Sequence, residues 1–183
     1  MDKINLQIIR ESFGRVAWSH KTHEKAAEIE EKRAKKAKWV NVILTFLTFL
    51  SFSASMVFST ETWPVYIAVF LSALSLSFNF YLLSFSPEKI AEQHRYIAKE
   101  LWGLREKYVN FIADIMNEKI STEEIVMRRD QFIKDLNIVY KFAPQTSTEA
   151  YCKAGNALKN NEELTFSNEE INKFLPKELH ITE

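Results

Sequence analysis

The sequence predicts an all-α membrane protein, in which a two-span transmembrane helical hairpin continues into an antiparallel cytoplasmic helical stalk with extra C-terminal helices. Three observations predict this class. Charged side chains are almost absent from residues 39–87, apolar residues recur at alternating spacings of three and four on both sides of that region, and helix-capping sequences recur towards the C-terminus. The overall composition hides this division, because the formal net charge is zero.

Residues 1–38 are predicted to form a cytoplasmic amphipathic helix. Its stripe consists of Leu6, Ile9, Phe13, Val16, His20, His23, Ala27, Glu30, Ala34 and Ala37. Such a 3-4 alternation follows one side of a helix, which is the pattern of a coiled-coil-like seam. The segment ends in the basic run KRAKKAK, residues 32–38.

Two long runs without charge follow, and each predicts a transmembrane helix. Residues 39–60 and 63–86 both exceed about eighteen residues, and at about 1.5 Å per residue each covers the roughly 30 Å hydrocarbon core of a bilayer. The external loop, residues 61–62, is so short that the two helices must be antiparallel neighbours. Trp39 marks one interfacial aromatic belt and Trp63 the other.

The basic flanks of the two spans predict their orientation. Residues 32–38 precede the first span, and Lys89, Arg95 and Lys99 follow the second, whereas the connecting loop has no basic residue. Because Lys and Arg are retained on the cytoplasmic side, both termini should be cytoplasmic. The basic run is either a general stop at the membrane surface or a site that binds an anionic lipid.

The connection between the spans holds Glu61, the only ionisable side chain between Lys38 and Glu88. Its neighbours Ser59, Thr60 and Thr62 supply turn and capping chemistry. A carboxylate near a helix N-terminus is favoured by the helix dipole. In an oligomer the same residue would recur as a ring of negative charge that favours cations. We therefore expect Glu61 to be a helix cap or a pore-mouth residue.

Serine, threonine and asparagine fall on one stripe of each predicted span. The candidates for lining a pore are Asn41, Thr45, Thr48, Ser55 and Ser59 in the first span and Ser72, Ser75 and Asn79 in the second. Small polar faces let helices approach closely and hydrogen-bond across their interface. Repeated around an oligomer, the same stripe would line a water-filled path. Packing and pore lining are both compatible with the sequence, and different stripes can serve different roles.

Residues 87–118 are predicted to form the second stalk helix. Its seam consists of Ile90, His94, Ile97, Leu101, Leu104, Tyr108, Phe111 and Ile115. Because the hairpin places the two cytoplasmic helices side by side, they should pair antiparallel. Counting outward from the membrane puts His94 nearest Glu30, and it puts His20 near Leu104.

Three histidines therefore point into the predicted seam. The HxxH spacing of residues 20 and 23 suits a metal, but no cysteine or acidic signature accompanies it. Polar residues that set the register are one interpretation, a metal site is a second, and a pH-sensitive or ligand-coupled switch is a third. The residues concerned are His20, His23, Glu30 and His94.

Residues 119–183 are predicted to be a cytoplasmic C-terminal helical region. Ser121 and Glu124 open one helix as a capping box, and the same entry chemistry recurs at Ser167 and Glu170. These helices should pack on the stalk. The best basic cluster for contact with an anionic ligand, which is otherwise a solvated helix face, consists of Arg128, Arg129 and Lys134.

The sequence lacks the patterns expected of an enzyme. With only three glycines, it has no phosphate-cradling loop. The single cysteine, Cys152, has no nucleophile motif around it and excludes an intramolecular disulfide. We expect no catalytic residue, no metal and no cofactor.

Four stretches in order resemble the SLATT family, which comprises bacterial two-transmembrane effectors of nucleotide-linked conflict systems. They are KRAKKAKW before the hairpin, EKIAEQHRYIAKELWGLREKY after it, then YKFAPQTSTEAYCKAGNAL and NEEINKFLPKEL. Some relatives operate with a cyclic-oligonucleotide synthase, some with a nucleotide-sensing domain, and some beside a reverse transcriptase.

The resemblance implies an anti-phage membrane effector of the bacterial inner membrane, which oligomerises into a signal-gated pore and causes abortive infection. Its partners would be the lipid bilayer, other copies of itself, and either a nucleotide signal or a separate sensor protein from the same defence system. No direct binding of nucleic acid is expected. The alternative is a non-conducting, membrane-anchored scaffold that recruits a cytoplasmic partner, and a weaker one is a soluble helical adaptor with a buried hairpin.

Overall fold

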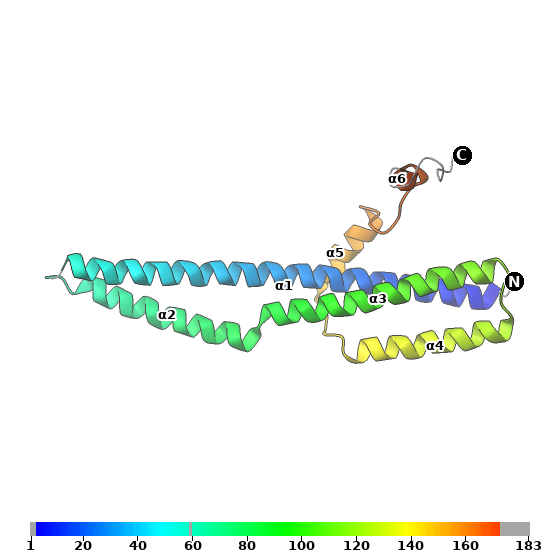
Figure 1. Ribbon diagram of the computed structural model, residues 1–183, viewed down its shortest axis with the longest axis horizontal. Coiled ribbons are helices and arrows are strands. Elements are labelled where there is room, and N and C mark those ends of the chain that lie inside the picture. The colour runs from blue at the N-terminus through cyan, green and yellow to red at the C-terminus, as the bar shows by residue number, and fades with distance from the viewer. Residues whose placement is uncertain (1–2, 59, 173–183) are drawn as a thin grey trace. The chain divides into compact units, whose positions relative to one another are not determined.

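The computed structural model describes residues 3–58 and 60–172, and within them it contains helices and no strand, which confirms the all-α class. Figure 1 labels the helices in chain order. They are α1 (Lys3–Val57), α2 (Trp63–Phe85), α3 (Pro87–Met116), α4 (Thr122–Lys141), α5 (Thr148–Lys159) and α6 (Asn168–Asn172).

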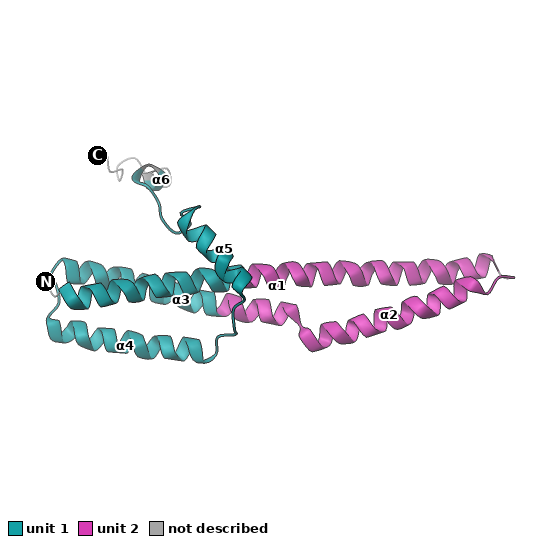
Figure 2. Cartoon of the chain, turned by 180° about the vertical axis from the view of Figure 1, so that it is seen from behind, with its two compact units in different colours: residues 1–25, 97–183 teal, residues 26–96 magenta. Residues whose placement is uncertain are grey.

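The chain forms two compact units, shown in different colours in Figure 2. The hairpin unit comprises residues 26–96, and the bundle unit comprises residues 1–25 and 97–183. Both α1 and α3 contribute to each unit. Helix α1 thus runs without a break from the stalk into the first span, because no glycine or proline interrupts it between the amphipathic segment and the apolar run.

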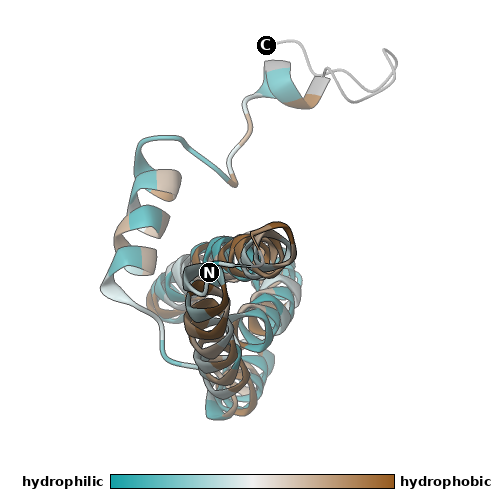
Figure 3. Cartoon of the chain, turned by 90° about the vertical axis from the view of Figure 1, so that its left-hand side faces the viewer, coloured by the Kyte–Doolittle hydropathy of each residue, from teal (hydrophilic) through white to brown (hydrophobic). Residues whose placement is uncertain are grey.

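The hairpin unit pairs the C-terminal part of α1 with α2, and Figure 3 colours most of this pair as hydrophobic. Buried and half-buried positions at spacings of three and four form one row on each helix. They are 41, 44, 48, 51 and 55 on α1, and 64, 68, 71, 75, 78 and 82 on α2, and positions 53, 54 and 79 beside these rows are also half-buried. One narrow seam therefore holds the hairpin together, and the remaining apolar surface points outward.

The outward surface of the hairpin carries large apolar side chains. Phe49, Phe70 and Phe80 are each more than 60% exposed, at 64%, 67% and 61%. Within the described residues, α1 and the helix that begins at Trp63 are long and apolar enough to cross a membrane, and their most apolar windows are 0% and 6% buried in the chain. The core helix of a soluble protein is mostly buried, so this exposure suits contact with lipid.

Helix α2 ends at Phe85, and α3 begins at Pro87. The Ser86 N–H still donates to the carbonyl of Leu82 at 2.9 Å, and the next amides donate back to the Ser86 carbonyl. Proline disfavours helical backbone in the residue before it and has no N–H of its own. The second stalk helix, predicted from residue 87, therefore begins at Pro87.

The bundle unit buries the seam predicted for the stalk. Its core consists of Leu6, Ile9 and Val16 from α1, Ile97, Leu101, Leu104, Tyr108, Phe111 and Ile115 from α3, and Ile125 from α4. Helix α4 closes this core through Phe132, whose ring lies 4.5 Å from that of Tyr108 and 5.3 Å from that of Phe111. It is also tied to α1, since Arg129 donates to Asn5 at 2.7 Å.

The C-terminal helices begin at the capping residues that the sequence indicates. The Ser121 hydroxyl accepts from the Glu124 N–H at 3.3 Å, and the Ser147 hydroxyl accepts from the Ala150 N–H at 3.2 Å. At Ser167 the capping box is complete, because its N–H also donates to the Glu170 carboxylate at 2.9 Å. Such caps satisfy backbone donors that a helix start leaves open.

Candidate functional site

Three residues of the predicted polar stripes meet inside the hairpin. The amide groups of Asn41 and Asn79 exchange hydrogen bonds at 3.1 and 3.2 Å, and the Ser75 hydroxyl donates to the Asn41 side-chain oxygen at 3.3 Å. Contacts of this kind contribute about 0.6 to 2 kcal/mol each between membrane helices. For these three residues the structure therefore shows the packing role.

Two further stripe residues, Thr48 and Ser55, are half-buried on the same seam. Their hydroxyls donate to backbone carbonyls of their own helix, Thr48 to Leu44 at 2.8 Å and Ser55 to Phe52 at 2.7 Å. A hydroxyl that donates to its own helix leaves no unpaired donor in the seam, and its side chain is small. Thr48 and Ser55 thus help the helices to approach.

Thr45 and Ser72 differ from the other stripe residues because both are exposed. Thr45 lies one turn along α1 from Asn41, and Ser72 lies one turn along α2 from Ser75, in each case towards the connecting loop. Since the helices are antiparallel, the two hydroxyls lie at a similar level, beside the asparagine pair. Ser59, the remaining pore candidate, lies outside the described residues.

Glu61 is exposed in the connection, one residue before Thr62, the N-cap residue of α2. The prediction of side-chain capping at Thr62 is wrong, because that side chain makes no capping hydrogen bond. Its backbone is helical, with φ −96° and ψ −17°, whereas a capping side chain needs an extended backbone. The first turn of α2 contains no acid, so Glu61 lies outside the helix, and its place at a pore mouth stays a prediction.

The buried histidines lie on the seam, as predicted, and His20 contacts Ala98 and Trp102 of α3. Its Nδ1 lies 2.9 Å from the carbonyl oxygen of Ala98, and its ring centroid lies 5.3 Å from that of Trp102. A count of residues outward from the membrane predicted Leu104 as its neighbour. Such a count does not include the axial offset between the two helices. Burial lowers the pKa of His94 below its usual value, and the nearby Glu30 carboxylate opposes that shift.

His23 is also buried, at 5% exposure. Among the described residues, no group of three histidine, cysteine or acidic side chains has the arrangement to hold a metal ion. A metal role for the HxxH spacing therefore gains no geometric support in this part of the chain.

Arg128 and Arg129, two of the three candidates for an anionic ligand, contact acidic side chains. Arg128 pairs with Glu124 and lies 3.8 Å from Asp114, and Arg129 pairs with Asp130 at 3.0 Å. Lys134 lies on the same helix. A ligand would have to compete with these carboxylates, and the anion site stays a prediction.

An ionic cluster that joins the C-terminal segment to α1 was not predicted. Lys21 Nζ lies 2.6 Å from Glu163 and 2.7 Å from Glu24, and Lys25 lies 3.8 Å from Glu163. Burial alone would lower the pKa of Lys21, but hydrogen bonds to Glu163 and Glu24 raise it above its ordinary value. The same bond with Lys21 lowers the pKa of Glu163.

Helix α5 docks next to this cluster by its small face, where Ala150, Ala154 and Ala157 are buried. The absence of a side chain at Gly155 lets the Trp18 ring approach, since a Cβ there would lie 3.3 Å from it. Tyr151 packs on the same ring at 5.3 Å. The repeated alanines are the one signal in the sequence that pointed to this contact.

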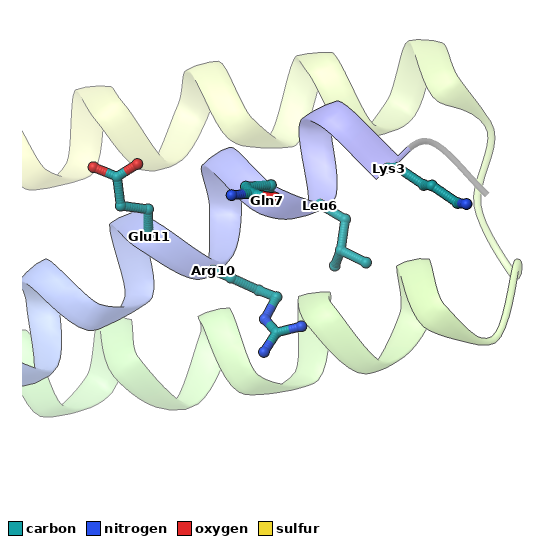
Figure 4. A pocket seen from close by; sticks show the side chains of 5 residues that line it. All are labelled: Lys3, Leu6, Gln7, Arg10 and Glu11. Carbon is teal, nitrogen blue, oxygen red and sulfur yellow. The ribbon is translucent and has the colours of Figure 1, made fainter.

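A surface hollow of about 610 Å³ lies near the beginning of α1. Figure 4 shows its lining, with Leu6 and Arg10 on one side of the helix and Glu11 on the other. The remaining lining residues are Lys3 and Gln7. Lys3 and Arg10 are the cationic residues of this lining. Glu11, its acidic residue, pairs with Arg15 at 2.8 Å.

Comparison with known proteins gives one family. A search of the curated proteins and a search of the solved structures found no match. A family model described as the SMODS and SLOG-associating 2TM effector domain family 4 matches residues 6–170, which include the hairpin, the bundle core and the docked α5. The two long apolar helices are the two transmembrane segments of that description. The chain is therefore a membrane protein with two spans, and it belongs to the SMODS and SLOG-associating 2TM effector domain family 4.

Proposed function

We propose that this effector acts in bacterial anti-phage defence by assembling into a homo-oligomeric, signal-gated pore that disrupts the inner membrane. The observation that supports a pore best is the exposed pair Thr45 and Ser72 beside the asparagine pair, on a hairpin whose exposed side chains are mostly apolar. Polar side chains at membrane depth usually face other helices or a water-filled cavity. In an oligomer, this side of each hairpin would face the central path.

The bundle unit would receive the signal on the cytoplasmic side. The family description associates such effectors with SMODS and SLOG proteins, so the proposed trigger is a nucleotide signal or a separate sensor protein. No catalytic step and no contact with nucleic acid enter this proposal. Assembly of the hairpins would itself be the damaging event.

The test compares leucine substitutions on two sides of the hairpin. Thr45→Leu with Ser72→Leu makes the proposed lining apolar, and Ser77→Leu makes the same change elsewhere on α2. Ser77 is exposed, and its position five residues from Ser72 puts it about 140° around the helix. Potassium efflux is measured in cells with the triggered defence system, and crosslinking in membranes reports assembly.

We expect the Thr45 and Ser72 double variant to assemble without efflux and Ser77→Leu to behave as wild type. Efflux from the double variant at the wild-type rate would contradict a pore lined by this side. A protein that assembles but never conducts, even as wild type, would instead be the scaffold that recruits a cytoplasmic partner. Thr48 and Ser75 are poorer test positions, because leucine there would disturb the seam of the hairpin.

A further inference from the structure

The basic run before the first span divides into paired and unpaired cations. Arg33 contacts Glu30, and Lys38 contacts Glu88. The others, Lys32, Lys35 and Lys36, are exposed and have no ion pair among the residues that the structure describes. Lys32, Lys35 and Lys36 thus differ from the other cations of the run because no carboxylate in the described part of the chain neutralises them.

These unpaired lysines lie on the outer face of α1. The seam side of this segment is marked by Ala34, which is 5% exposed. At about 100° per residue, Lys32 and Lys36 each fall about 160° from Ala34, and Trp39 falls about 140° from it. Lys35 lies at the edge of the same face, about 100° from Ala34. The Trp39 side chain is 68% exposed at the first residue of the apolar run. We call Lys32, Lys35, Lys36 and Trp39 the cationic face.

We propose that the cationic face binds the head groups of anionic phospholipids in the membrane surface. Its charge is complementary to phosphate, and its location fits a lipid rather than a soluble anion, because it continues directly into the span. Tryptophan is favoured at the level of the head groups, where its ring lies between water and hydrocarbon. Lysines on this level reach the phosphates while their aliphatic stems cover apolar surface.

The paired cations of the same segment are much less suited to this role. Arg33 and Lys38 already have carboxylate partners, and Arg95 on α3 likewise donates to Glu31 at 2.7 Å. A lipid phosphate would have to displace those carboxylates, whereas the cationic face has only water to lose. A basic run that acts only through its total charge would make no such distinction.

The experiment removes two charges from either subset. Lys32→Gln with Lys36→Gln alters the cationic face, and Arg33→Gln with Lys38→Gln is the matched control in the same segment. Each full-length protein is placed in nanodiscs with equal amounts of phosphatidylglycerol and phosphatidylcholine. Native mass spectrometry of the released protein then counts the lipids of each kind that stay bound, with and without added inorganic phosphate.

Wild type and the control are expected to retain phosphatidylglycerol preferentially. Each cation near an anionic surface is worth roughly fivefold in binding, so the face variant should lose about 25-fold of that preference. Equal losses in both variants would overturn the proposal in favour of total charge, and equal retention of the two lipids by wild type would overturn it outright. Loss of phosphatidylglycerol to inorganic phosphate would show a general anion site, which also contradicts it.

Discussion

At the scale of single residues, the hydrogen-bonded pair Asn41 and Asn79 and the buried His94 have the largest consequences. The asparagines satisfy each other in a hairpin whose other surface suits lipid. His94 is 3% exposed on the seam, and a charged imidazolium there would lose most of its hydration. The asparagine pair therefore joins the two helices of the hairpin. We expect the buried His94 to make the stalk sensitive to acid.

We expect the stability of the protein in detergent to fall as the pH drops below about 6.5. Burial lowers the folded-state pKa of His94, so at a pH between the two pKa values the unfolded chain binds more protons than the folded one. Stability is then complete above the unfolded value and is lost on acidification. Thermal unfolding between about pH 8 and pH 5 measures this dependence.

His94→Gln should flatten that pH dependence, because glutamine does not titrate. A variant with the same slope as wild type would contradict the assignment of this pH dependence to His94.

The buried face of each helix could be predicted, because it depends on the local spacing of apolar residues. The 3-4 spacing identified the buried seam residues, since a helix face follows directly from spacing. The count along the two helices placed Glu30 near His94, as observed, but it did not predict the contacts of His20 with Ala98 and Trp102. The partner of Asn41 was not predicted either, because such contacts depend on the axial offset of two helices. That offset is set by side-chain packing along the whole length of the two helices, so no single position in the sequence indicates it.

At the scale of elements, helix α5 is joined to α1 by small contacts from several sides. The Trp18 ring touches Gly155 and Tyr151, and the Glu163 carboxylate binds Lys21 beyond the helix end. The caps at Ser121 and Ser167 could be predicted, because capping is a local pattern in the sequence. The docking of α5 was predicted only in general terms, since Trp18 lies far from it in sequence.

We expect Trp18→Ala to release α5 while the rest of the bundle stays folded. Losing a packed tryptophan costs about 3 kcal/mol, and Trp18 contacts both Gly155 and Tyr151 of α5. Hydrogen exchange of the α5 amides should become much faster. Trp102→Ala is the matched control, because Trp102 contacts His20 and Arg105 instead of α5. Equal exchange in both variants would contradict the docking described here.

At the scale of the whole molecule, the family match and the exposed apolar hairpin agree on two membrane spans. The fold class was predictable because a bilayer imposes length and hydrophobicity on a span, and both are visible in sequence. The assembled state could not be predicted from the sequence. The polar stripe packs between the helices at Asn41 and Ser75, but it is exposed at Thr45 and Ser72. Spacing alone does not separate these two uses.

The orientation of the hairpin can be tested with the single cysteine, Cys152, which is exposed on α5. A maleimide that does not cross membranes should label it in inverted vesicles and not in intact cells, because the positive-inside rule predicts that both termini are cytoplasmic. In a Cys152→Ser background, Glu61→Cys should show the reverse pattern. Labelling of both positions from one side would rule out a hairpin that spans the membrane.

The membrane potential of cells during triggered defence is the sharpest test of the proposed pore. A potential-sensitive dye would follow cells that contain the intact defence system and this chain at a level verified in the membrane fraction. A pore predicts that the potential collapses when the system is triggered and stays normal in cells without the chain. An unchanged potential, with the protein present in the membrane and the system active, would contradict the account.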